Sequence, residues 1–400
     1  MQTDEVSSFD TRPQSPLCSF EGAVSFLDAE GEVFSVPLHY GNPATEERAL
    51  KEGKAVTDFS DREIVQVSGP DRLSWLESLS TQRLVDMTAG DSSELLILSP
   101  QGHIENYAGI CEDGESVWLM CDTGYGQAMV DFLNSMRFML RVEVQARPDM
   151  AALALYGNFP PEAIQSAVGE STPALIWNDP WAHTAEGGAL YGVDDGEHPG
   201  CAGEPMRVLL CQRDKLADTA RACVTAGYRL AGSLAAEAMR VRRWQPRMSF
   251  EGAAPSALPH EFDWLRTAVH LHKGCYRGQE TVAKIVNLGR PPRRLAYLYL
   301  EGEFGDLPPA GSDVVWNRRA CGQLTSAVRS TDEGAVALAV LRRAVPLDAI
   351  LDVGEYRASQ KEIVTCEGKS SVSPQTRPGA ELRGSIPARA SSAQTRANLA

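Results

Sequence analysis

The sequence predicts an α+β protein in which two mixed blocks precede a small all-β block. Strand-like and helix-like patterns follow one another without a regular βαβα alternation, which favours α+β over a doubly wound sheet. Beyond residues 289–292 (Gly-Arg-Pro-Pro) the chain changes to short apolar runs broken by Gly, Pro and Asn, which predicts a β-barrel or sandwich. The length of 400 residues allows two or three domains at about 150 residues each.

The first mixed block is predicted from its periodicity. Residues 62–67 alternate apolar and polar side chains like a half-buried strand, and a Gly-Pro-Asp turn separates them from apolar residues at helical spacing over 73–79. The remaining elements expected in this block are strands at 94–98, 104–110, 117–121 and 141–145 and a helix at 129–136.

The second mixed block opens with an apolar strand predicted at 151–156. The elements expected after it are a helix at 161–168, a strand at 206–211, helices at 214–226 and 233–244, and a loop at 187–205. We therefore expect five segments, namely a disordered N-terminus at 1–16, α+β domains at 17–149 and 150–289, a β-barrel domain at 290–365 and a disordered tail at 366–400. The tail is rich in Ser, Pro, Arg and Ala and cannot bury enough apolar surface to offset the entropy lost on ordering.

Charge and composition exclude several classes of protein. The chain has 38 Lys and Arg against 53 Asp and Glu, a net charge of −15, which argues against a surface for broad nucleic-acid binding. No apolar run approaches the ~18 residues of a membrane span, and the first residues do not resemble a secretory signal. The nine cysteines contain no CxxC pair. We expect a cytoplasmic protein without disulfides, without a thiolate zinc site, and without direct contact with membrane or nucleic acid.

One local segment predicts chemistry, the octapeptide Lys273-Gly274-Cys275-Tyr276-Arg277-Gly278-Gln279-Glu280, which precedes a helical pattern. The cationic side chains of Lys273 and Arg277 and the positive end of that helix would favour the thiolate form of Cys275. The two glycines would let the backbone approach a ligand or adopt positive φ. The alternative is a small buried cysteine in a tight connection. His270 and His272 could join Cys275 as metal ligands, but no fourth ligand stands at a characteristic spacing, so no metal is expected.

A second segment concentrates positive charge in this acidic chain. It is MRVRRWQPR, with four arginines at positions 240, 242, 243 and 247 around Trp244. Such a cluster suits a ligand with a flat ring and carboxylates, through stacking and bidentate guanidinium contacts. An exposed helix face is the alternative.

The octapeptide KGCYRGQE resembles the signature of the YgfZ family of folate-binding proteins, K-G-C-[YF]-x-G-Q-E. The resemblance extends to HYGNPATEERAL, VSGPDRLSWLESLSTQ, LSPQGHIE, LPHE and NLGRPPRRL, and covers roughly residues 36–345. That family is similar to the T-protein of the glycine cleavage system, a tetrahydrofolate-dependent aminomethyltransferase, and CGQLTSAVRS resembles a segment of its C-terminal barrel. The implied fold is a cloverleaf of two α+β domains and one β-barrel around a central channel.

The resemblance also implies a ligand, partners and roles for single residues. It implies binding of tetrahydrofolate or a derivative, partnership with iron–sulfur proteins or their assembly factors, and an indirect part in tRNA modification. Cys275 would be the functional thiol, and the candidate folate contacts are Arg240, Trp244, Asn106 and Glu261. The aspartate that the T-protein needs is missing here, and Glu105 stands nearest to its place, so an active aminomethyltransferase is not expected. The alternative is a folate-dependent one-carbon transferase that uses Glu105 as its acid.

Overall fold

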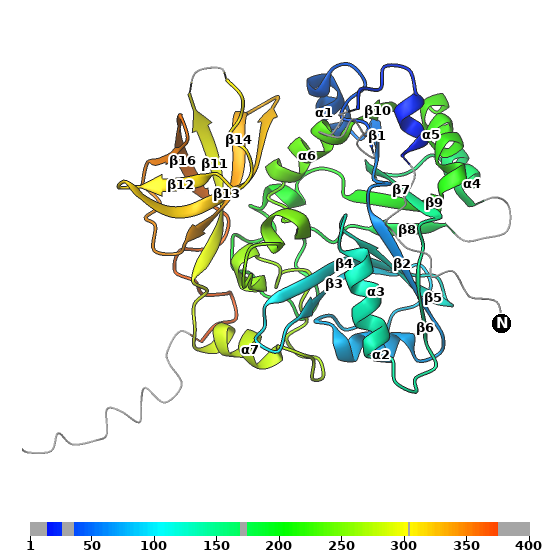
Figure 1. Ribbon diagram of the computed structural model, residues 1–400, viewed down its shortest axis with the longest axis horizontal. Helices are drawn as coiled ribbons and strands as arrows, with labels where there is room; N and C mark the ends of the chain where they lie inside the picture. Colours follow the sequence, from blue (N-terminus) through cyan, green and yellow to red (C-terminus); the bar gives the residue numbers. More distant parts are fainter. Residues whose placement is uncertain (1–13, 26–35, 169–173, 303–304, 375–400) are drawn as a thin grey trace, which may run out of the picture.

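A computed structural model describes residues 14–25, 36–168, 174–302 and 305–374. Its strands form two five-stranded sheets and one closed barrel (Figure 1). The α+β class predicted from the sequence is confirmed, and the C-terminal block is a barrel rather than a sandwich. Within the described residues no helix has the length and apolar character needed to cross a bilayer.

The first sheet is antiparallel throughout. Its strands, in spatial order, are β3 (Ser92–Leu98), β4 (Ile104–Glu112), β5 (Ser116–Cys121), β2 (Glu63–Ser68) and β6 (Glu143–Ala146). Two helices, α2 (Arg72–Leu79) and the amphipathic α3 (Gly126–Ser135), bury Leu76 and Leu133 against it. The alternation that predicted the strand at 62–67 therefore separates the helix-covered face, which carries Val65 and Val67, from the opposite face.

The second sheet combines strands from two distant parts of the chain. In spatial order it contains β10 (Arg229–Ala231), β1 (Ala55–Asp58), β7 (Met150–Tyr156), β9 (Met206–Gln212) and β8 (Leu175–Asn178). Helices α4 (Pro161–Val168) and α5 (Leu216–Thr225) cover one face. The strand β7 is buried along its whole length, which explains its uninterrupted apolar sequence. Because β1 pairs here, the sheets do not follow the expected segments 17–149 and 150–289, whose boundaries stay a prediction.

The two sheets pack face to face across a shared apolar layer. Ile64, Trp118 and Met120 of the first sheet meet residues of β7 and β9 in one cluster. The sheets approach closely at Gly109 of β4, where a Cβ atom would lie 2.7 Å from the ring of Trp177 in β8. Glycine at this position therefore lets the indole sit on the first sheet, where its Nε1 donates a 2.7 Å hydrogen bond to the carbonyl of Ser93.

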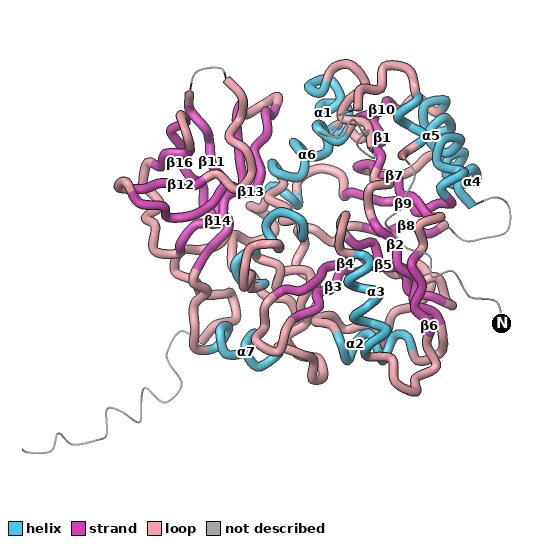
Figure 2. The backbone as a smooth tube through the Cα atoms, in the orientation of Figure 1, coloured by secondary structure: helices cyan, strands magenta, loops and turns pink. Residues whose placement is uncertain are grey.

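The barrel lies beside the sheets, and helix α6 (Ser233–Arg242) packs between them (Figure 1). Its strands, in order around the barrel, are β11 (Arg293–Glu301), β14 (Gly334–Arg342), β13 (Arg319–Ser330), β12 (Asp313–Trp316), β15 (Leu351–Val353) and β16 (Tyr356–Glu362). Helix α1 (Pro43–Lys51) packs on α6. Its N-cap is Asn42, whose side chain accepts hydrogen bonds from two backbone amides. Much of the centre of the molecule is loop (Figure 2).

The described parts of the two chain ends are packed, which differs from the disorder expected at 1–16 and 366–400. The hydroxyl of Ser15 donates to the carboxylate of Asp58, and Leu17 is buried. Near the other end, the amide of Ser371 donates to the carbonyl of Leu190, and the hydroxyl of Ser373 donates to that of Val286. These polar partners, which composition does not show, hold the segments in place. Residues 1–13 and 375–400 lie outside the described residues.

Candidate functional site

The octapeptide loop docks onto the hairpin between β3 and β4. Gly278 adopts φ of 85° and is the N-cap of helix α7 (Gln279–Asn287), which confirms the helix expected there. A Cβ atom on Gly278 would lie 2.6 Å from the carbonyl oxygen of Ser99 in the hairpin. A Cβ atom on Gly102 of the hairpin, whose φ is 80°, would lie 2.8 Å from the Cβ atom of Thr281 in α7. Positive φ and close backbone approach thus require both glycines.

Lys273 fixes the other end of the octapeptide. Its ammonium group donates to the backbone carbonyls of Glu77, Ser80 and Gln82, around the C-terminal end of α2. Burial lowers the pKa of Lys273 to about 8. The ammonium also lies 5.2 Å from the ring centroid of the buried Tyr276. Lys273 is therefore a structural anchor for the loop.

Between these two anchors the loop presents its thiol to solvent. All nine cysteines lie within the described residues, and Cys275 is the one that is exposed. The guanidinium of Arg277 is paired with Glu105 of β4 at 2.9 Å. The structure therefore brings Glu105 next to the octapeptide. The reactivity of Cys275 stays a prediction.

The two histidines before the octapeptide do not gather around this thiol. His270 is buried, and its Nδ1 accepts a 3.2 Å hydrogen bond from the amide of His272. Their ring centroids are 6.3 Å apart. Within the described residues, three other side chains bring metal-binding atoms close together. That group does not contain His270, His272 or Cys275.

A cavity of about 840 Å³, including its mouth, lies between the two sheets and α6. Four aromatic rings line it, from the β1–β2 loop and from strands of both sheets: Phe59, Tyr107, Tyr156 and Trp177. The hydroxyl of Tyr107 donates a 2.7 Å hydrogen bond to Glu94, and its ring stacks on Trp264 at 5.5 Å. The lining therefore offers flat apolar surface in a fixed orientation.

Charged side chains form the polar part of the cavity lining. Three of its arginines are paired with its carboxylates: Arg62 with Asp122, Arg247 with Asp122 and Asp61, and Arg240 with Glu237. Burial lowers the pKa of Arg62 to about 10. It also raises the pKa of Asp58, at the edge of this lining, to about 6. The cavity thus combines fixed hydrogen-bond donors and acceptors with apolar rings.

The predicted folate contacts lie in different places. Arg240 lines the cavity, whereas Trp244, Asn106 and Glu261 are not among its lining residues. Trp244 packs edge-on to His198 in the central core, Asn106 donates to the carbonyl of Tyr125, and Glu261 is fully buried. These three side chains therefore pack or form hydrogen bonds inside the protein, away from the cavity.

Sequence reasoning missed most of the cavity lining. Arg240 and Arg247 belonged to the arginine cluster, which was the one local signal. Tyr107 and Tyr156 lie on predicted strands, where an aromatic residue fits an ordinary core equally well. No element was predicted at Phe59 or Trp177. Their convergence depends on the pairing of the sheets, which no local spacing encodes.

Comparisons with known proteins agree with this architecture. No protein-family model matches the chain. The chain is 24% identical over 298 residues to a candidate chloroplastic transferase of Arabidopsis thaliana, a match that covers 70% of this chain and 62% of that protein. It is 30% identical over 164 residues to the tRNA-modifying protein YgfZ of Edwardsiella ictaluri, which covers 39% and 48%. The chain thus spans less than two thirds of the length of these relatives.

Comparison with a solved structure identifies the fold. The glycine cleavage system aminomethyltransferase T from Bartonella henselae superposes with a TM-score of 0.62 at 17% identity, over 87% of this chain and 94% of that one. The chain is similar to YgfZ proteins and has the T-protein fold. The resemblance found in the octapeptide and its flanking segments is thereby confirmed.

Proposed function

We propose that the protein binds a reduced folate, tetrahydrofolate or a derivative, in the cavity between the two sheets. The observation that carries this proposal is the lining, in which four aromatic rings stand beside arginine–carboxylate pairs. A pterin is a flat ring with hydrogen-bond donors and acceptors on its edge, so it can stack on aromatic side chains and bind fixed polar groups. The similarity to YgfZ and the T-protein fold support this choice of ligand.

We further propose that the protein is an accessory factor for iron–sulfur proteins or their assembly, and acts on tRNA modification through them. The exposed Cys275, held in a loop anchored at both ends, supplies an accessible thiol for this role. The name of the YgfZ relative supports the link to tRNA. Direct tRNA binding is not part of the proposal, because a chain with a net charge of −15 is poorly suited to a phosphate backbone. The proposal places the protein in the cytoplasm.

The position of Glu105 does not favour the transferase alternative. A catalytic acid has to reach the ligand within hydrogen-bonding distance. Glu105 is not among the residues lining the cavity, and its carboxylate is paired with Arg277. We therefore do not assign it a catalytic part.

The folate proposal is tested by anaerobic calorimetric titration with tetrahydrofolate. Ala236 of α6 lines the cavity and is half-buried, so Ala236→Phe fills the space without removing a polar contact. We expect micromolar binding by the wild type and its loss in Ala236→Phe. The matched control is Leu234→Phe, at an exposed position of the same helix, which should bind as the wild type does. No binding by the wild type, or equal binding by a folded Ala236→Phe variant, would refute the proposal.

The role of the thiol is tested by alkylation at neutral pH followed by mass spectrometry. We expect Cys275 to react faster than the other eight cysteines, since those are buried or half-buried. A Cys275→Ser variant should fold normally and fail to restore iron–sulfur enzyme activity in cells that lack the protein. Restoration by this variant to the wild-type level would remove the thiol from the proposed mechanism.

A further inference from the structure

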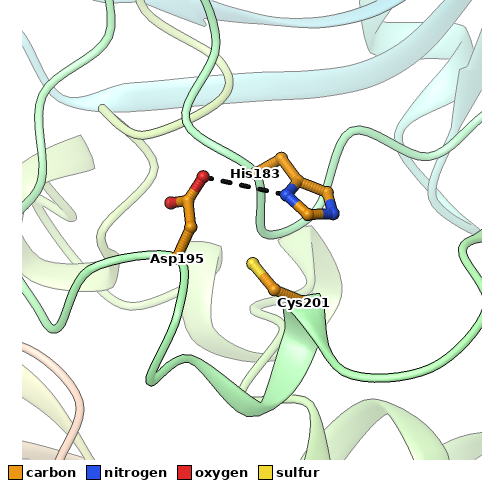
Figure 3. Close-up of side chains that lie close together, drawn as sticks. All are labelled: His183, Asp195 and Cys201. Atoms are coloured by element: carbon orange, nitrogen blue, oxygen red, sulfur yellow. Dashed lines mark ion pairs between the residues drawn. The ribbon is translucent and has the colours of Figure 1, made fainter.

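Three side chains with metal-binding atoms converge in the connection between β8 and β9. They are His183, Asp195 and Cys201, and their ligand atoms all lie within 4.8 Å of one another. Nδ1 of His183 is 3.7 Å from Oδ2 of Asp195. Figure 3 shows the imidazole, the carboxylate and the sulfur turned toward one another. None of the three lines the folate cavity.

The carboxylate of Asp195 is held in position by neighbours outside this group. Thr184 donates to it from its hydroxyl at 2.7 Å and from its amide at 3.0 Å. Arg266, which is fully buried, donates to Oδ1 at 2.8 Å. Each carboxylate oxygen has two lone pairs, so Oδ2 can accept the Thr184 amide and still bind an ion. Outer hydrogen bonds of this kind orient metal ligands.

Cys201 is also positioned by local structure. It ends the 3-10 turn η3 (Pro199–Cys201), whose first residues are capped by His198, because Nδ1 of that ring accepts the amide of Gly200 at 3.0 Å. The amide of Cys201 donates to the carbonyl of His198 at 3.0 Å. The half-buried sulfur therefore faces the group from a fixed backbone, whereas the imidazole of His183, 66% exposed, can rotate toward an ion.

The connection that holds the three residues has little regular structure of its own. All of residues 179–205 are described, and η3 is the one helical or strand element within them. Long connections without secondary structure are uncommon in compact domains and usually have a function. An ion bound by His183, Asp195 and Cys201 would join three separate points of this connection, and through Arg266 would link it to the segment before the octapeptide.

We propose that His183, Asp195 and Cys201 bind a divalent transition-metal ion, for which Zn²⁺ is the best match. One imidazole nitrogen, one thiolate sulfur and one carboxylate oxygen are the donor types that zinc takes, with a fourth position left for water. The thiolate and the carboxylate together balance the charge of the ion. Binding replaces the thiol proton of Cys201, which is released to solvent, so the affinity rises with pH.

The first test is titration of the chelator-treated full-length protein with Zn²⁺ in competition with a chromophoric chelator. We expect one ion per chain, with proton release and a raised unfolding temperature. His183→Ala removes one ligand from an exposed position and should not disturb folding, and it should weaken binding at least about tenfold. Cys201→Ser should do the same. The control is Cys18→Ser, a half-buried thiol outside the group, which should bind as the wild type does.

Substitution by Co²⁺ identifies the sulfur ligand directly. Ligation by Cys201 should give a thiolate-to-cobalt charge-transfer absorption that persists in Cys18→Ser and is lost in Cys201→Ser. The proposal is overturned if the wild type binds no stoichiometric Zn²⁺, or if His183→Ala and Cys201→Ser bind it with unchanged affinity. Neither experiment involves folate, so their outcome is independent of the proposed function.

Discussion

At the scale of single residues, Glu94 is a buried carboxyl group that fixes Tyr107, one of the aromatic residues of the cavity lining. It is 1% exposed and accepts hydrogen bonds from the hydroxyls of Tyr107 and Thr267. Burial raises the pKa of Glu94 from 4.5 to about 7. The folded state therefore binds this proton more tightly than the unfolded state. The resulting stabilisation is complete below about pH 4.5 and is lost as the pH rises through about 7.

Glu94→Gln keeps the shape of the side chain and removes its titration. We expect the free energy of unfolding of the wild type to fall relative to that of Glu94→Gln by up to roughly 3 kcal/mol between about pH 4.5 and 7. Urea unfolding across this range measures the difference. Glu162→Gln, at an exposed position of α4, should follow the wild type. Parallel pH profiles for wild type and Glu94→Gln would contradict the assignment.

At the scale of elements, the contact between the octapeptide loop and the β3–β4 hairpin depends on one of the two octapeptide glycines. Gly278 has positive φ and lies against the carbonyl of Ser99, whereas a Cβ atom added to Gly274 would have no heavy atom outside its chain neighbours within 4 Å. We expect Gly278→Ala to destabilise the protein by about 1–3 kcal/mol and Gly274→Ala to have little effect. The melting temperatures of the two variants, measured by thermal unfolding, compare the two glycines within one loop. Equal melting temperatures would show that this packing does not hold the loop.

Elements of different length were predictable to different degrees. The strand at 62–67 followed from its alternation of apolar and polar residues, whereas β3, β4, β5 and β7 followed from short apolar stretches. The short strands β1, β8 and β10 were missed, because three or four residues carry no period and become strands through the neighbours they pair with. Helix α1 was also missed, although Asn42 followed by Pro43 is a helix start signal. Helix α6 ends at Arg242, before Trp244, whose φ is 56°.

At the scale of the whole molecule, the residues that line the cavity could not be identified before the fold was known. Its lining comes from the β1–β2 loop, from strands of both sheets and from α6. The octapeptide was predictable because its residues are contiguous. The aromatic lining was not, because Tyr107 and Trp177 meet through sheet packing that only the complete fold defines.

A buried ion network around Arg240 is one of the connections between the barrel and helix α6. Arg240 of α6 pairs with Glu237 at 2.6 Å and with the fully buried Glu251 at 3.0 Å, and it also bonds the hydroxyl of Ser326 in β13. Glu251 in turn accepts a 2.6 Å hydrogen bond from Thr325. Removing the guanidinium takes the ion-pair partner away from two carboxylates, of which Glu251 is fully buried. The role of Arg240 is thus structural in addition to any contact with folate.

Arg240→Met should therefore cost about 3–5 kcal/mol of unfolding free energy, and the double variant Arg240→Met/Glu251→Gln should recover part of it. Denaturant unfolding measures both. The control is Arg221→Met on α5, whose ion pair with Asp218 is more than 60% exposed on both sides and should be worth less than about 1 kcal/mol. If Arg240→Met lost tetrahydrofolate binding at unchanged stability, the arginine would act on the ligand alone, and the barrel would be held by its other contacts with α1 and α6, such as the ion pairs of Arg242 with Asp332 and Glu333.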